Sequence, residues 1–345
     1  MPVARLLREQ TVGETRWAAL GERGEAVALY LERASDIQRP VIGERLQARV
    51  RRIDTVLGGA FVDLGAKGEA FLRLKTGDTL TEGAALAVDV AAEARRNKLA
   101  RVRVADAQAA PVQGATRWRA GLNGGAAAVT EDRPAGCAEI QSAFDDALAA
   151  SVTLPGGGRL QAERTEALIA ADIDTGGRSA RGGRAANALA VNLDAASELA
   201  RQIHLRGWGG LAVLDCVAPV DKNAGGHIRA RFLDAFRAIS DRQVKALAPS
   251  AFGLMEISAD WQLTPLSERL MENPAETLAL DGLRRLEAAA RAERMKRIGL
   301  VLPEAACAWL DASGLGPIGK LSETYGARLT IEAGRLETPD VRTLS

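Results

Sequence analysis

The sequence has few of the cysteine and histidine residues that build zinc sites and disulfides, and it lacks the long apolar runs that span membranes. Its 345 residues include only three cysteines, Cys137, Cys216 and Cys307, which lie far apart and form no Cys-x-x-Cys pair. This spacing argues against a zinc site and a disulfide framework, so we expect a reducing compartment and no zinc. No stretch is apolar over the length of a bilayer, and the N-terminus lacks the apolar core of a signal peptide. We therefore expect a cytoplasmic protein with no membrane partner.

The sequence also has almost no net charge and few histidines. The formal net charge is +1, so any basic surface that binds nucleic acid must be local. The only histidines, His204 and His227, are isolated from each other, and we expect packing or surface roles for both. The length is sufficient for two or three domains with cores of their own.

Two aspartates at the ends of apolar runs are the most informative feature of the sequence. Asp172 ends one run and Asp215 ends another. Both runs are typical of buried strands. The segment between them carries an apolar stripe at helical spacing, formed by Leu189, Leu193, Ala196, Ala200 and Ile203. A strand, a helix and a strand in this order predict two parallel strands whose carboxyl ends open on one edge of a sheet.

Carboxylates at such an edge predict a metal site. Side chains alternate along a strand, so Asp174 shares a face with Asp172, and Asp215 approaches both if its strand is the immediate neighbour. Close carboxylates repel one another unless a cation is present, and hard oxygen ligands favour Mg²⁺ or Mn²⁺. Such an ion orients water and stabilises charge on a phosphodiester. The alternative, that these aspartates only cap turns or the following helix, stays open.

Five short strand-like segments separated by glycine-bearing turns follow the first 38 residues. They lie at 46–53, 59–65, 69–72, 85–90 and 99–104. Five short strands predict a small barrel of the OB type. Phe61 and Phe71 lie on consecutive strands among basic residues, an arrangement that stacks the bases of single-stranded nucleic acid. In the alternative interpretation both phenylalanines belong to the barrel core.

The remaining segments predict a connector, further α/β structure and a C-terminal unit. Residues 105–133 are rich in alanine, glycine and proline, which indicates a connector with little structure of its own. An amphipathic helix follows Asp215 near 228–239, and another strand-like run lies at 250–258. The last eighty residues predict a small α+β unit that carries no obvious chemistry.

Several of these segments together resemble the catalytic core of the ribonuclease E/G family. The run 155–177 contains Asp172 and Asp174, and the runs 192–196, 200–206, 209–215 and 252–258 follow in the family's order. The segment 59–65 and the pair 71–72 are similar to that family's S1-type RNA-binding barrel.

The resemblance implies a multidomain α/β (α+β) fold. An S1-type OB barrel is inserted near the N-terminus of a catalytic core that combines RNase H-like and DNase I-like parts. The expected divisions are N-terminal strands of the RNase H-like part at 1–38, the S1-type barrel at 39–105, a connector and the remainder of the RNase H-like part at 106–160, the DNase I-like catalytic domain at 161–262 and a small C-terminal α+β domain at 263–345.

The resemblance also implies an endoribonuclease of RNA processing or decay. Such an enzyme cuts single-stranded RNA, including mRNA or ribosomal RNA precursors, to 5′-phosphate and 3′-hydroxyl ends, with Mg²⁺ held here by Asp172 and Asp215. Asp174 stands where the family usually has asparagine, and it adds a catalytic ligand or only negative charge. Phe61, Phe71 and Lys98 match the family's RNA contacts. Three arginines after Asp174 either hold neighbouring phosphates or belong to a solvated loop: Arg178, Arg181 and Arg184.

The sequence also departs from the family in two longer segments. Only the short alanine- and glycine-rich connector stands where the family carries a long segment with a 5′-end sensor, and residues 261–265 replace the two-cysteine zinc link. We therefore expect a compact member, and a homo-oligomer without a zinc link stays open. The alternative function is a non-catalytic RNA-binding family member in RNA regulation or ribosomal RNA handling. A small-molecule phosphohydrolase would explain the acids but would leave the barrel without a role.

Overall fold

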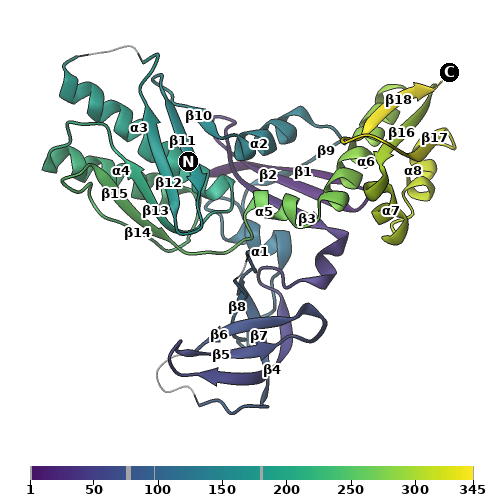
Figure 1. Ribbon diagram of the computed structural model, residues 1–345, viewed down its shortest axis with the longest axis horizontal. Coiled ribbons are helices and arrows are strands. Elements are labelled where there is room, and N and C mark those ends of the chain that lie inside the picture. The colour runs from purple at the N-terminus through teal and green to yellow at the C-terminus, as the bar shows by residue number, and fades with distance from the viewer. Residues whose placement is uncertain (1, 75–78, 97, 179–181, 345) are drawn as a thin grey trace.

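The chain folds into a mixed α/β structure with a closed barrel. The computed structural model describes residues 2–344 except 75–78, 97 and 179–181. These residues form three β-sheets, one closed barrel, eight α-helices and two short 3-10 helices, η1 (Ala34–Gln38) and η2 (Gly65–Lys67) (Figure 1). In this part of the chain, no helix combines the length and the apolar character that a membrane span requires.

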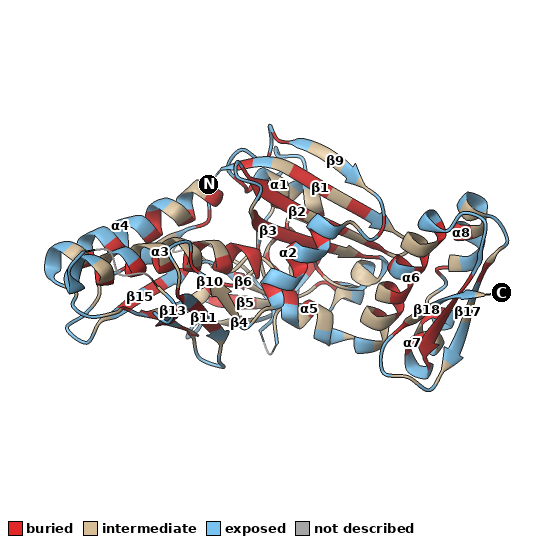
Figure 2. Ribbon diagram, turned by 90° about the horizontal axis from the view of Figure 1, so that it is seen from above, coloured by how far each residue is buried: buried red, intermediate tan, exposed pale blue. Residues whose placement is uncertain are grey.

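A four-stranded sheet forms the centre of the molecule. Its strand order is β3 (Ala26–Arg33), β2 (Glu14–Gly21), β1 (Val3–Thr11) and β9 (Val129–Arg133), with β9 parallel to β1. Helix α1 (Gly114–Ala120) packs on one face and α2 (Ala138–Leu148) on the other, so the first three strands are largely buried (Figure 2). The expectation of an unstructured connector at 105–133 was wrong, because α1 and β9 both lie within it.

The barrel is inserted between β3 and α1. Its strands run in the order β4 (Arg45–Asp54), β5 (Gly59–Asp63), β6 (Glu69–Arg73), β8 (Ala100–Val104) and β7 (Ala85–Ala92), and β7 pairs with β4 to close it. Small and branched side chains fill the interior, among them Ala60, Val62, Ala70 and Leu72. The predicted five-stranded barrel is confirmed, and it projects away from the sheets at the bottom of Figure 1.

A six-stranded sheet carries the two aspartates. Its strand order is β10 (Ser151–Thr153), β11 (Arg159–Arg164), β12 (Ile169–Asp174), β13 (Gly210–Asp215), β15 (Leu254–Ala259) and β14 (Val244–Ala246). Helices α3 (Arg184–Leu205) and α4 (Lys222–Ile239) have the apolar stripes that the sequence predicted.

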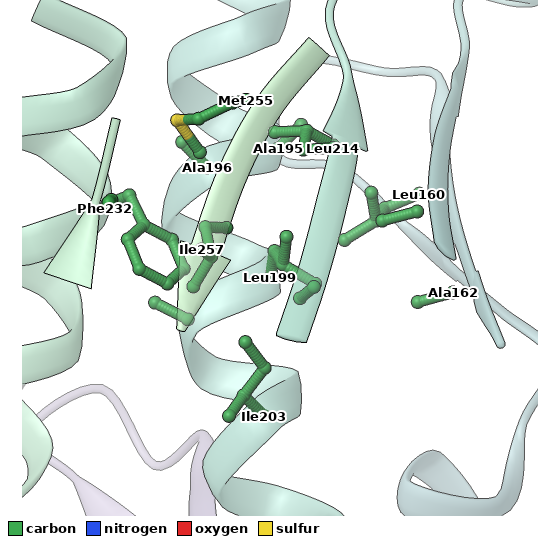
Figure 3. Packing of buried hydrophobic residues seen from close by; sticks show 14 of the residues in the cluster. Leu160, Ala162, Ala195, Ala196, Leu199, Ile203, Leu214, Phe232, Met255 and Ile257 are labelled. Atoms are coloured by element: carbon green, nitrogen blue, oxygen red, sulfur yellow. The ribbon is translucent and has the colours of Figure 1, made fainter. Parts of the chain in front are cut away.

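Only one face of this sheet is buried. Ala195, Leu199 and Ile203 of α3 and Phe232 of α4 pack against Leu214 and Ile257 of the sheet (Figure 3). Along β12 and β13 every second side chain is exposed or only partly buried, so the prediction of buried strands holds for one face of the sheet only. The other face is therefore available for polar chemistry.

The C-terminal unit has its own core. Strands β17 (Leu329–Gly334), β16 (Arg297–Pro303) and β18 (Asp340–Leu344) form its sheet in that order, and α6 (Pro274–Ala292), α7 (Glu304–Ala312) and α8 (Pro317–Tyr325) pack against it. Helix α5 (Leu266–Glu272) precedes α6 and connects this unit to the rest of the molecule.

A buried ion cluster joins the C-terminal unit to the central sheet. Glu14 of β2 accepts hydrogen bonds from Arg16 at 2.7 Å, from Arg33 of β3 at 3.0 Å and from Arg284 of α6 at 3.0 Å. Its side chain is 1% exposed. Burial alone would raise the pKa of Glu14, but the charges of the three arginines outweigh it and lower that pKa. The carboxylate is therefore ionised in the folded protein.

The Glu14→Gln variant is expected to lower the free energy of unfolding by about 3 to 5 kcal/mol near pH 7, because it leaves buried guanidinium groups without their counter-charge. Urea unfolding of both proteins measures the difference. A lowered folded-state pKa means that the contribution is present above the unfolded value of about 4.3 and is lost as the pH falls, so the difference should shrink through that range. The exposed Glu332→Gln on β17 is the control, and an equal loss there would contradict the prediction.

Candidate functional site

The parallel pairing of β12 and β13 brings two aspartates to one place. The strands pair from Ile169 opposite Ala212 to Ala171 opposite Leu214, and the next residues are Asp172 and Asp215. Ala171 and Leu214 point into the core, so the aspartates, one step further, point to the open face. The predicted parallel arrangement of neighbouring strands is confirmed, and it sets the two carboxylates side by side.

Both carboxylates are free of hydrogen-bonding partners in the part of the chain that the structure describes. Within the described ranges, neither Asp172 nor Asp215 takes part in a hydrogen bond or an ion pair, and both are exposed. Two accessible oxygen donors fit Mg²⁺, which usually takes one or two carboxylates and keeps several waters. Across the same described residues, no three His, Cys, Asp or Glu side chains are grouped closely enough to hold a metal together.

Asp174 has a structural contact of its own. It lies on the same face of β12 as Asp172, but its Oδ1 accepts a hydrogen bond from the backbone N–H of Gly176 at 2.8 Å. This is the turn contact typical of aspartate after a strand. The geometry therefore favours a turn-stabilising role for Asp174 and leaves Asp172 and Asp215 as the pair of exposed carboxylates.

The chain after Asp215 is held by two residues that the sequence analysis did not single out. The buried side chain of Asn192 in α3 donates to the carbonyl of Val217 and accepts from its N–H, both at 2.9 Å. Gly253 has a φ of +85°, its carbonyl accepts from the N–H of Cys216, and a Cβ there would lie 3.8 Å from Oδ1 of Asp215. These contacts fix the direction in which β13 ends.

Cys216 and His204 are buried and unsuited to metal binding. Burial, and then the charge of Asp215, raise the pKa of the Cys216 thiol to about 12, so it stays protonated. His204 forms hydrogen bonds with the Ala200 carbonyl and the Ser240 hydroxyl, and burial lowers its pKa to about 3. The packing role expected for His204 agrees with these contacts.

The arginines after Asp174 differ in their surroundings. Arg178 donates to Asp194 at 2.8 Å and to the Gly157 carbonyl at 3.0 Å, so its guanidinium already has partners. Arg184 is exposed at the first turn of α3 and, with Arg178, lines a cavity of about 490 Å³ beyond the ends of β12 and β13. Arg181 lies outside the described residues.

The barrel presents an aromatic pair on its outer surface. Phe61 of β5 and Phe71 of β6 are paired across the strands, with ring centroids 5.4 Å apart in an edge-to-face arrangement. Arg52 lies 4.6 Å from the Phe61 centroid. Both rings are only partly buried, while their neighbours Ala60, Val62, Ala70 and Leu72 form the core. Lys98 is exposed in the turn that precedes β8.

Sequence reasoning also missed a tryptophan where the barrel meets the six-stranded sheet. The guanidinium groups of Arg95 and Arg164 lie 4.3 Å and 5.2 Å from the ring centroid of Trp261. Arg101 donates to the Trp261 carbonyl at 3.2 Å. The only signal in the sequence was a single tryptophan in the segment 261–265.

Known proteins are similar in sequence to the part of the chain that contains both aspartates and the last two strands of the barrel, residues 74–261. A sequence profile of the Ribonuclease E/G family matches residues 74–261, more than half of the chain. Ribonuclease E of Haemophilus influenzae is 31% identical over 216 residues, which are 58% of this chain and 23% of that protein. Ribonuclease E of Escherichia coli K12 is 32% identical over 223 residues, or 60% of this chain and 20% of that protein.

A shorter relative gives the same result. Ribonuclease G of Escherichia coli K12 is 30% identical over 122 residues, which are 35% of this chain and 24% of that protein. The chain thus spans about a quarter or less of the length of these relatives. The profile match includes both strands that carry Asp172 and Asp215, and it extends over more than half of the sequence. The chain belongs to the ribonuclease E/G family.

Proposed function

We propose that the protein is an endoribonuclease that cuts single-stranded RNA with a divalent metal, Mg²⁺ or Mn²⁺, held by Asp172 and Asp215. The observation that carries this proposal is the pair of exposed carboxylates at matching positions of two neighbouring parallel strands, neither with a partner among the described residues. The names of the relatives, all ribonucleases, support RNA as the substrate.

Asp172 and Asp215 would hold the ion, which would neutralise charge on the scissile phosphodiester and orient the attacking water. The protein's part is to keep Asp172 and Asp215 at one spacing before substrate arrives, because preorganised charges cost no reorganisation during the reaction. Asn192 and Gly253 contribute by fixing the chain after Asp215. Hydrolysis of this kind, as in the family, leaves 5′-phosphate and 3′-hydroxyl ends.

The other RNA contacts belong to the barrel and to the carboxyl edge of the sheet. Phe61 and Phe71 offer partly exposed rings to bases, and Lys98 and Arg52 offer charge to phosphates. Arg184, which lines the cavity beyond β12 and β13, is suited to a neighbouring phosphate. Arg178 instead supports the loop through Asp194.

Asp172→Asn and Asp215→Asn are each expected to reduce cleavage by more than about 100-fold, since even residues one shell removed from a metal are worth roughly 10- to 100-fold. The assay is cleavage of a fluorescent single-stranded RNA with Mg²⁺, with Mn²⁺ and with EDTA. We expect no cutting in EDTA, and 5′-phosphate on the downstream product with either metal.

Two substitutions on the same face serve as controls. Glu163→Gln on β11 removes the same charge from an exposed side chain and should retain cleavage. Asp174→Asn should lose much less than the two metal-site variants if its role is the turn contact with Gly176. Tight RNA binding without cutting by the wild-type protein would favour the non-catalytic RNA-binding alternative, and activity in Asp172→Asn would refute the metal site.

Phe71→Ala is expected to weaken binding of a single-stranded RNA by about 1 to 3 kcal/mol, the range for loss of one stacked base. Fluorescence anisotropy in EDTA measures this without cleavage. Val56→Ala is the matched control, because Val56 lies in the β4–β5 turn and is 94% exposed. Unchanged affinity together with a lower melting temperature would mean that Phe71 stabilises the barrel and does not contact RNA.

A further inference from the structure

Four arginines meet one tryptophan and one glutamate where the barrel contacts the six-stranded sheet. We call this group the junction cluster: Arg95, Arg96, Arg101, Arg164, Trp261 and Glu268. The arginines come from both sides of the junction. Arg95, Arg96 and Arg101 belong to the barrel, while Arg164 is the last residue of β11.

Trp261 is fixed in place by the sheet. Its indole packs against Gly209 and Gly210 at the start of β13, where an added Cβ would lie 3.0 Å and 2.9 Å from the ring. The ring is therefore a rigid surface against which the guanidinium groups of Arg95 and Arg164 rest, at the cation–π distances given above.

The cluster has more positive charge than its own acid balances. Glu268 pairs with Arg164 and with Arg96, the latter at 3.5 Å, and it also accepts from the N–H of Arg96 at 2.8 Å. Over the part of the chain that the structure describes, neither Arg95 nor Arg101 has an acidic partner. Burial, and then the charges of Arg101 and Arg164, lower the pKa of Arg95 to about 10.

One donor in the cluster is also unused. The Nε of Arg101 is buried and has no hydrogen-bond partner among the described residues. That nitrogen is closed to solvent, so it is not itself a phosphate contact. A packed group of like charges is unfavourable by itself, and an anion that reaches the guanidinium groups reduces their repulsion. Guanidinium groups are the preferred protein partners of phosphate.

The cluster lies beside the aromatic pair of the barrel, at the end of the six-stranded sheet where β12 and β13 begin. Arg101 of β8 is paired directly with Phe71 of β6, so the row of side chains across the barrel continues from Phe61 through Phe71 to Arg101. Arg164 of β11 is paired with Ile169, which lies three residues, or about 10 Å, before Asp172 along β12, so the side chain of Arg164 starts from the face of the sheet opposite to the two carboxylates.

We propose that Arg95 and Arg101, positioned by Trp261, bind a backbone phosphate of the single-stranded RNA where the strand passes from the barrel to the carboxylate pair. This inference rests on the proposed function for its ligand, and it assigns a phosphate site to residues outside the barrel's aromatic pair and outside the metal site. The site reads charge and not base identity, so it contributes affinity to every sequence equally.

The test is the salt dependence of RNA binding by the full-length protein. A fluorescent ten-nucleotide oligouridylate is titrated in EDTA at several salt concentrations with wild type, Arg95→Gln and Arg101→Gln. Each variant is expected to bind roughly tenfold more weakly at low salt, as for loss of a charge-assisted hydrogen bond. The slope of log K against log salt should fall by about 0.7, the value for one phosphate contact on a single strand.

Two further variants separate phosphate binding from a structural role. Arg335→Gln removes one charge from a side chain that is 96% exposed in the C-terminal unit, and it should leave the affinity and the slope unchanged. Arg95→Lys keeps the charge and should restore most of the slope. Weaker binding with the wild-type slope and a lower melting temperature would show that the arginines only attach the barrel to the sheet, and the proposal would fall.

Failure of this proposal is distinguishable from failure of the proposed function. The binding assay contains no metal and needs no cleavage. If the slope of log K against log salt changes as expected but no RNA is cut with Mg²⁺, the phosphate site is supported and the protein is a non-catalytic RNA-binding protein. If RNA is cut but the Arg95 and Arg101 variants keep the wild-type slope and affinity, the phosphate site is refuted and the nuclease stands.

Discussion

The parallel, in-register pairing of β12 and β13 is the constraint on which the candidate site depends. One residue of slippage would turn Asp215 into the core and Leu214 toward solvent, so the hydrophobic packing of α3 and α4 against the other face also fixes the carboxylates. The connection through α3 makes the strands parallel, and the buried Asn192 of that helix holds the chain that leaves β13. Fold stability and the geometry of the site thus have the same physical origin.

Local patterns in the sequence predicted which helices and strands form better than they predicted how those elements pair and how deeply they are buried. The five barrel strands, α3, α4 and the strands that carry Asp172 and Asp215 follow from alternation, helical spacing and glycine positions. The same patterns failed at β9, because its pairing with β1 spans more than a hundred residues and its alanine- and glycine-rich surroundings carry no period. The open face of the six-stranded sheet was also missed, since Ala170 and Val213 on that face are apolar and made β12 and β13 read as buried.

The roles of charged residues were the least predictable feature. Arg178 and Arg184 look alike in the sequence, but the first is bonded to Asp194 and the second is exposed beside a cavity. Trp261 and Arg164 are separated by almost a hundred residues, and only the fold brings them together. Contacts of this kind depend on the packing of one unit against another, for which a single sequence carries no local signal.

The insertion of the barrel into the central sheet has a consequence for substrate direction. The barrel has two covalent connections to the same sheet, through η1 and α1, and Glu93 at its base bonds the backbone of Thr264 and Gln262. Because of these attachments, the barrel cannot rotate relative to the central sheet as it could on a single linker. An RNA strand is chemically polar, so under the proposed function a barrel of fixed orientation would present it to the carboxylates with one end leading. The chain connectivity would then decide on which side of a bound nucleotide the strand is cut.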